Sequence, residues 1–113
     1  MKIIKRKDTK IINGTCGEIQ EMLNSNDLSI SYVKITSDFT THMHREMVEI
    51  YYILSGKGLV TIEDEERQVE KDDIIPIPKN KFHSIKQTSD EPLELLTITK
   101  SRYNPDDVIE KGI

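Results

Sequence analysis

Three histidines and one glutamate stand at spacings that suit the coordination of a metal ion. His42 and His44 are separated by one residue, Glu49 follows after four residues, and His83 lies much later in the chain. On an extended strand, side chains two positions apart point to the same face, so the imidazoles of His42 and His44 can converge on one ion. Imidazole and carboxylate ligands together suit Fe, Mn, Ni, Zn or Cu(II). The pattern therefore predicts a site for one divalent transition metal whose identity stays open.

Each of these residues also has an ordinary interpretation. A single histidine is most often a surface residue or a packed one, and Glu49 is one of 20 acidic residues in the chain. The combination carries more weight than its members, because the histidine pair, the acid and His83 all fall where strands are predicted to begin.

Two polar residues on the predicted strands are candidates for catalysis. Alternation along a strand places Tyr51 on the same face as Glu49, and Gln87 on the same face as His83. The Tyr51 hydroxyl could orient a ligand or donate a proton, although simple packing explains it equally well. Gln87 could donate a hydrogen bond to substrate or to a metal-bound water. Two further residues are candidates for the same interior: Tyr32 and Thr97.

The elements that must position these residues are strands. From about residue 29 the hydrophobic pattern has a period of two, which is typical of strands. Short strands at close and regular spacing, separated by turns, favour an antiparallel sandwich or a closed barrel. The predicted strands cover residues 29–36, 48–54, 58–63, 67–70, 74–77, 82–87 and 93–99.

Weaker signals lie towards the two ends of the chain. Lys2–Lys7 is predicted as a weak strand. Thr15–Glu18 has a capping-box pattern followed by apolar residues at helical spacing, so one or two helical turns are expected there. Asn104–Pro105 is a good helix start and Gly112 a good stop, so we expect a short C-terminal helix.

Composition narrows the class of protein. The 113 residues, with no repeat or linker-like stretch, predict one domain over 1–113. A net charge of −4 argues against a nucleic-acid partner or an anionic membrane surface. No apolar run approaches the length of a membrane span, and no signal-peptide pattern opens the sequence. The single cysteine, Cys16, excludes an internal disulfide framework and suits a cytoplasmic location.

The spacing around the histidines resembles the first motif of the cupins, G(X)5HXH(X)3–4E(X)6G. The chain has His42-Met43-His44, four residues, Glu49, six residues and Gly56, with Thr36 in place of the opening glycine. The string EIYYILSGKG also looks like the small single-domain cupins of the conserved-barrel type-2 pattern, which are similar to the mannose-6-phosphate isomerase-like cupins.

The second cupin motif, G(X)5PXG(X)2H(X)3N, is matched at Pro78 and His83. Its first glycine is replaced. Asn80 replaces its second glycine, and Asn tolerates the left-handed conformation that such a turn requires. Gln87 replaces its final asparagine, and no departure falls on a ligand position. The resemblance covers about residues 29–107.

The resemblance implies a double-stranded β-helix, or jelly-roll barrel, of six to eight strands. His42, His44, Glu49 and His83 would point inward and hold one divalent metal. Four protein ligands on an octahedral ion would leave two positions open, which is typical of a catalytic metal rather than a structural one. The resemblance also implies a homodimer.

The function that the resemblance implies is a small metalloenzyme of the isomerase, lyase or dioxygenase class, acting on a small carboxylate, carbonyl or sugar-like compound. The alternative is a non-catalytic cupin that binds a small molecule or sugar beside its metal. Lys79 and Lys81 lie near His83 in sequence and could attract an anionic substrate, although solvated lysines explain them as well.

Overall fold

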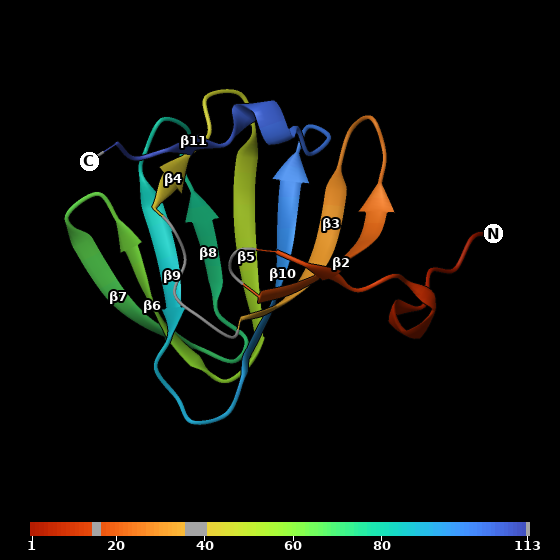
Figure 1. The fold of residues 1–113 in the computed structure, drawn as a ribbon, viewed down its shortest axis with the longest axis horizontal. Coiled ribbons are helices and arrows are strands. Elements are labelled where there is room, and N and C mark those ends of the chain that lie inside the picture. The colour runs from red at the N-terminus through yellow and green to blue at the C-terminus, as the bar shows by residue number, and fades with distance from the viewer. Residues whose placement is uncertain (15–16, 36–40, 113) are drawn as a thin grey trace.

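The structure, a computed structural model, describes residues 1–14, 17–35 and 41–112. Its elements in chain order are the 3-10 turn η1 (Arg6–Asp8), β1 (Ile12–Asn13), β2 (Gly17–Asn24), β3 (Ser29–Ile35), β4 (His42–Met43), β5 (Val48–Ser55), β6 (Lys57–Ile62), β7 (Glu65–Glu70), β8 (Ile74–Ile77), β9 (His83–Gln87), β10 (Leu93–Lys100), the 3-10 turn η2 (Pro105–Asp107) and β11 (Ile109–Glu110). The strands form a six-stranded sheet, β1-β2-β3-β10-β5-β8, and a five-stranded sheet, β11-β4-β9-β6-β7 (Figure 1).

The hydrophobic core lies between the two sheets. The six-stranded sheet contributes Ile35, Ile53 and Leu95, and the five-stranded sheet contributes Val60 and Ile85, all of them buried. These residues alternate with exposed or half-buried neighbours along each strand, which is the pattern of a sheet with one face in the core. The prediction of an all-β fold is confirmed, and the strands predicted from residue 29 onward have bounds within two residues of those expected. The described strands form two facing sheets rather than one closed barrel.

The segment from Gly17 to Asn24 is the strand β2, so the prediction of helical turns is wrong for these described residues. Pairing with β3 overrides the helical spacing of the apolar residues, since Ile19 lies opposite Val33 in the sheet. Gly17 permits this pairing with a φ of +144°, and a Cβ there would lie 2.1 Å from the carbonyl oxygen of Lys34. Thr15 and Cys16, which start the capping pattern, lie outside the described residues.

The N-terminal segment also differs from its prediction. The expected strand over Lys2–Lys7 is absent from the described residues, which instead form η1 on the outer face of the six-stranded sheet. Gln20 holds this turn in place by donating to the carbonyl oxygens of Arg6 and, more distantly, Thr9. This basic segment lacks the alternation of apolar and polar residues that is typical of a strand in a sheet.

The expected C-terminal helix is replaced by η2 and the short strand β11. Asn104 caps the turn as predicted, accepting a hydrogen bond from the backbone N–H of Asp106. The turn ends because Ile109 and Glu110 pair with β4 and Asp107 directs its carboxylate to another segment of the chain. None of the helical turns among the described residues is long and apolar enough to cross a membrane.

Tyr32 points to the outer face of the six-stranded sheet, so the expectation that it faces the interior is wrong. The guanidinium of Arg6 lies 4.0 Å from its ring centroid, and its hydroxyl donates to Glu94. Burial, with the hydrogen bond to Glu94 and its negative charge, raises the pKa of Tyr32 to about 12.

We therefore expect one tyrosine to ionise about two pH units later than a free tyrosine. The shift contributes stability in full below about pH 10 and loses it as the pH rises through about 12. Absorbance titration of tyrosinate should lose its highest step in Tyr32→Phe, and Glu94→Gln should move that step to lower pH. A titration unchanged in Tyr32→Phe would contradict this assignment.

Candidate metal centre

The four residues that the spacing singles out lie together in the structure. One ligand atom from each of His42, His44, Glu49 and His83 falls within 4.8 Å of all the others. The Nε2 atom of His83 is 3.3 Å from Oε1 of Glu49, and Nε2 of His44 is 3.6 Å from the same oxygen. Two atoms that share one ion at about 2.0–2.2 Å lie about 3–4 Å from each other, so these distances fit a common metal.

Backbone hydrogen bonds set the direction of two imidazoles. Nδ1 of His44 lies 2.8 Å from the carbonyl oxygen of Asp107, and Nδ1 of His83 lies 3.0 Å from that of Lys81. A carbonyl only accepts, so each Nδ1 carries the proton and each Nε2 of a neutral ring is an acceptor. Both Nε2 atoms face a carboxylate oxygen of Glu49.

This convergence leaves three acceptors without a donor. Nε2 of His44, Nε2 of His83 and Oε1 of Glu49 are all buried, and among the described residues none of them has a hydrogen-bond partner. Buried acceptors without partners are costly, and a cation satisfies all three at once. The donor set of three imidazoles and one carboxylate therefore fits a divalent transition metal.

The protonation states of the cluster follow from its geometry. Burial alone would raise the pKa of Glu49, but the imidazoles of His44 and His83 lower it to about 2. Burial alone would lower the pKa of His44, but the Glu49 carboxylate raises it above its ordinary value. Glu49 is therefore ionised throughout the physiological range, as a metal ligand must be.

The ligands come from three strands and the loop after β4. His42 lies directly opposite His83 in the β4–β9 pairing, which explains how residues 41 positions apart meet. His44 follows β4, and its carbonyl oxygen accepts a hydrogen bond of 2.7 Å from the backbone N–H of Asn80. Glu49 opens the inward face of β5, as alternation predicts.

Asp107 is a positioning residue that the sequence analysis missed. Its buried carboxylate accepts backbone N–H groups from Arg45, Glu46 and Met47 at 2.8–2.9 Å, which fixes the loop between His44 and β5. In the sequence, Asp107 falls within the segment for which a C-terminal helix is predicted. No local signal links it to a loop sixty residues earlier.

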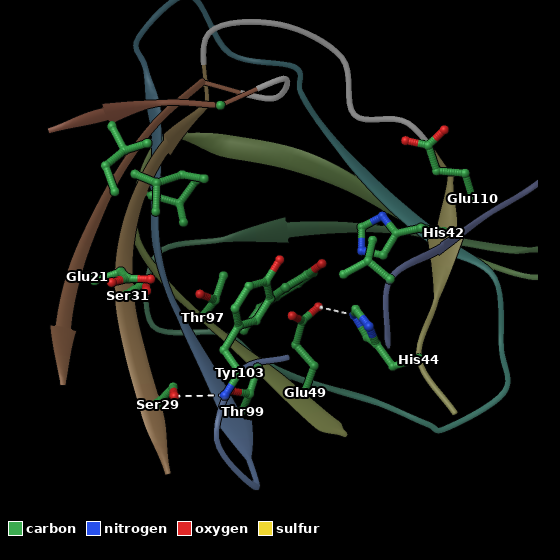
Figure 2. A pocket seen from close by; sticks show the side chains of 16 residues that line it. Glu21, Ser29, Ser31, His42, His44, Glu49, Thr97, Thr99, Tyr103 and Glu110 are labelled. Atoms are coloured by element: carbon green, nitrogen blue, oxygen red, sulfur yellow. Dashed lines mark hydrogen bonds and ion pairs between the residues drawn. The ribbon is translucent and has the colours of Figure 1, made fainter. Parts of the chain in front are cut away.

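A cavity of about 330 Å³ opens beside the cluster, which is at the lower end of small-molecule sites (Figure 2). Four apolar residues line part of it: Ile12, Ile19, Val33 and Val108. Tyr103 also lines the cavity, and its backbone N–H donates to Ser29 Oγ at 2.9 Å. Figure 2 shows the Tyr103 ring projecting across the space between Thr97 and His44.

Two rows of polar side chains cross the inward face of the six-stranded sheet at this cavity. We call them the first polar rung, formed by Glu21, Ser31, Thr97 and Tyr51, and the second polar rung, formed by Ser29, Thr99 and Glu49. Within each rung, neighbours lie directly opposite one another on adjacent strands. The next inward row, Ile19, Val33, Leu95 and Ile53, is apolar. The inward face of the sheet therefore passes from apolar core residues to polar cavity residues between one row and the next.

Of Tyr51, Thr97 and Gln87, which the sequence also singled out, two line the cavity and one lies away from it. Tyr51 is 2% exposed and lines the cavity, with its ring centroid 6.3 Å from that of His83, and Thr97 also lines it. Gln87 lies at the far end of β9, where its amide donates to the carbonyl oxygens of Ser89 and Glu91 at 2.8 Å. The structure therefore places Gln87 away from the cluster, although it shares the face of β9 with His83.

We expect Gln87 to stabilise the loop between β9 and β10 rather than the metal centre. Gln87→Leu removes this donor from two carbonyl oxygens that water can reach, which should cost about 0.5–1.5 kcal/mol of unfolding free energy. Metal content should not change. Urea unfolding and elemental analysis of the same preparation check both parts, and a metal-deficient but equally stable variant would contradict the assignment.

The sequence matches a family model described as a cupin domain over residues 31–99. That range is more than half of the chain and includes all four clustered residues. The chain belongs to the cupin family. An uncharacterised protein of Methanocaldococcus jannaschii is 35% identical over 117 residues, which cover 95% of this cupin and 94% of the relative.

Solved structures share the fold of this cupin at low sequence identity. Pac13, a Streptomyces nucleoside dehydratase, has a TM-score of 0.86 and 14% identity over 98% of this chain and 91% of its own. A protein from Planctomyces limnophilus has a TM-score of 0.86 and 23% identity over 96% of both chains. An oxalate decarboxylase from B. subtilis has a TM-score of 0.79 and 22% identity over 94% of this cupin and 31% of its own chain.

Two positions of the cupin motifs, one matched and one replaced, have a structural explanation. Gly56, which closes the first motif, has a φ of +79°, and a Cβ there would lie 2.4 Å from the carbonyl oxygen of Pro92. Asn80, which replaces a glycine in the second motif, has a φ of +63°. The prediction that Asn supplies the left-handed conformation of this turn is confirmed. Thr36 lies outside the described residues.

Proposed function

We propose that this cupin is a small metalloenzyme that binds one divalent transition metal and acts on a small oxygen-bearing compound in the adjoining cavity. The observation that carries the proposal is the convergence of three buried acceptors, Nε2 of His44, Nε2 of His83 and Oε1 of Glu49, to which the described part of the chain offers no donor. His42 completes the set at the edge of the cavity. A divalent metal held there would polarise oxygen atoms of a bound compound and stabilise developing negative charge.

The protein's own groups would then bind and orient the substrate. The two sheets exclude water from one side of the cluster, since His83 is 0% exposed and Glu49 6%. Tyr51 neighbours Thr97 across the β5–β10 pairing and lines the cavity, so its Oη is the group we assign to holding or moving a proton. This arrangement is compatible with isomerase, lyase and dioxygenase chemistry. It is also compatible with binding without turnover.

Metal content and turnover test the proposal separately. Purified protein stripped with chelator and reloaded should retain close to one equivalent of Mn, Fe, Ni, Zn or Cu after dialysis, as measured by elemental analysis. Each loaded form is then assayed on a panel of small carboxylates, carbonyl compounds and sugars, with oxygen uptake recorded. Oxygen uptake selects the dioxygenase class, and substrate change without uptake selects isomerase or lyase chemistry.

Two results would overturn parts of this proposal. A protein that takes up none of the five metals has no metal centre. A loaded protein that binds panel members without changing any of them is the non-catalytic alternative. Tyr51→Phe is the variant that tests the proton assignment: it should retain its metal equivalent and lose turnover, and an unaltered rate removes Tyr51 from the reaction.

A further inference from the structure

Apart from the histidines of the cluster, the described lining of the cavity carries acidic and hydroxyl groups and no lysine or arginine. Glu21, Glu49 and Glu110 line it, together with the serines and threonines of the two polar rungs. Of the described residues that line it, none is a lysine or arginine, and the stretches outside the description, residues 15–16, 36–40 and 113, contain none in the sequence. Lys79 and Lys81 are exposed, and Lys81 lines a separate shallow depression with Glu63 and Glu65.

This charge distribution disfavours an anionic ligand. A divalent ion held with Glu49 carries one net positive charge, and Glu21 and Glu110 offset it at the walls. A phosphate or carboxylate entering the cavity would meet the carboxylates of Glu21 and Glu110. The described lining offers it no guanidinium or ammonium group, which are the side-chain groups that recognise such anions. Glu21 and Glu110 are exposed, so water and salt weaken their repulsion of an anion without reversing its sign.

One hydroxyl points to a ligand independently of the charges. Thr99 is 3% exposed and lines the cavity, and its Oγ1 has no protein hydrogen-bond partner among the described residues. A buried hydroxyl without a partner costs free energy in the folded protein. Valine has the same shape and a strong preference for strands, so the fold alone does not account for threonine at this position.

The two polar rungs place further hydroxyls beside Thr99. Thr97 and Ser31 lie opposite each other on β10 and β3, and Glu21 ends the row on β2 as a carboxylate acceptor. Figure 2 shows Ser31 and Thr97 on one side of the cavity, His42 and His44 on the other, and Glu49 between them. A ligand that reaches both sides must present oxygen atoms to the cluster and several donors and acceptors to the rungs.

We infer that the compound bound in this cavity is a neutral polyhydroxylated molecule of monosaccharide size, rather than an anionic carboxylate or phosphate. The inference rests on the proposed function, since the metal centre would take one end of the molecule. The hydroxyls of the other end donate to Glu21 and exchange hydrogen bonds with Ser31, Thr97 and Thr99. A site built to hydrogen-bond hydroxyl groups discriminates strongly against compounds that lack them.

Matched pairs of probes test this inference on protein loaded with zinc, which suits nuclear magnetic resonance. D-ribose is compared with D-ribose 5-phosphate, and D-glucose with D-gluconate, by saturation-transfer difference titration. We expect each neutral sugar to bind at least tenfold more tightly than its anionic partner. Glu21→Gln should narrow that difference, because it removes a negative charge and keeps the shape of the side chain.

Thr99→Val separates a ligand-binding hydroxyl from a structural one. Affinity for the neutral sugar should fall about threefold to tenfold, the loss of one neutral hydrogen bond. The midpoint of urea unfolding of the ligand-free protein should stay the same or rise, because an unpartnered buried hydroxyl is removed. Thr61→Val, on the five-stranded sheet and outside the cavity lining, is the matched control and should not change affinity.

The outcomes distinguish this inference from the proposed function, because zinc content is measured on the same samples. Anionic probes that bind as tightly as the neutral sugars, or Thr99→Val that keeps full affinity, overturn the inference and leave the metal centre intact. A variant at Thr99 that loses both affinity and stability shows a structural hydroxyl and also overturns it. A wild-type chain that takes up no zinc overturns both.

Discussion

Replacing Glu49 with glutamine should abolish tight metal binding while leaving the fold intact. The substitution removes the anionic ligand but keeps the size and shape of the side chain, so the core around β5 should not be disturbed. Loss of even an outer hydrogen-bond partner of a metal ligand costs tenfold to a hundredfold in affinity. Loss of a ligand that carries the charge should therefore cost more than about a hundredfold.

The metal-free form should respond in the opposite direction. In the wild type, Oε1 of Glu49 faces Nε2 of His44 and Nε2 of His83, and no described residue donates a hydrogen bond to any of the three. A glutamine amide would bring two N–H donors to these acceptors. At a pH where the imidazoles are neutral, we therefore expect metal-free Glu49→Gln to unfold at the same or a higher temperature than the metal-free wild type. At lower pH, where His44 takes up a proton beside the Glu49 carboxylate, the wild type should be the more stable of the two.

Thermal unfolding with and without metal measures both effects in one series. Binding only to the folded state stabilises it by about 4 kcal/mol at a thousandfold excess over Kd, so the wild type should show a clear rise in Tm on loading. Glu49→Gln should show little or none, and Glu66→Gln, on the exposed β7, should behave as the wild type. Full retention of one metal equivalent by Glu49→Gln would contradict the assignment of this residue as a ligand.

Replacing Asp107 with alanine should give the largest loss of stability that we expect outside the hydrophobic core. Three backbone N–H groups, those of Arg45, Glu46 and Met47, lose an ionised acceptor at once. A hydrogen bond to a charged group contributes about 1.5–3 kcal/mol, and the three are not independent. We expect a loss of about 2–4 kcal/mol in the free energy of unfolding.

The same substitution should weaken metal binding without touching a ligand. The carbonyl oxygen of Asp107 accepts from Nδ1 of His44, so displacement of this segment removes the group that fixes the imidazole. Asp107→Asn should be intermediate, because one amide oxygen can still accept two of the three N–H groups. Asp106→Asn, at the exposed neighbouring position, is the control and should change stability by less than about 0.5 kcal/mol.

The role of Asp107 also has a signature in pH. Burial alone would raise its pKa, but the N–H groups of Met47, Arg45 and Glu46 lower it below the ordinary range. Its contribution is therefore present above about pH 4 and lost as the pH falls through the lowered value. Urea unfolding between pH 2 and 6 should show a weaker pH dependence in Asp107→Asn than in the wild type. An identical dependence in both proteins would contradict this role.

The sequence alone predicted what depends on local pattern. The pattern of short strands and turns from residue 29 onward located β3, β5, β6, β7, β8, β9 and β10. The spacing of His42, His44 and Glu49 predicted a cluster that the structure brings together. These signals succeed because strand alternation is set by neighbouring residues. The helical interpretation of the segment from Gly17 failed because pairing with a distant strand outweighed local spacing.

Features that depend on the pairing register of the strands could not be predicted from the sequence. Gln87 shares the inward face of β9 with His83, yet it lies at the other end of the strand, where it stabilises a loop. The polar rungs became visible only once pairing placed Ser31 opposite Thr97 and Thr99 opposite Glu49. A serine or threonine in a strand is unremarkable by itself, so only the order of the strands reveals the row.

The arrangement of the rungs has a consequence for how this protein could change. His42, His44 and His83 lie on or beside β4 and β9, whereas Glu21, Ser31 and Thr97 lie on β2, β3 and β10 of the other sheet. Substitutions on these three strands can therefore alter which compound fits without disturbing the ion that would act on it. Substitutions could therefore change substrate selectivity separately from the chemistry of the metal centre. The exception is β5, which carries both Glu49 and Tyr51.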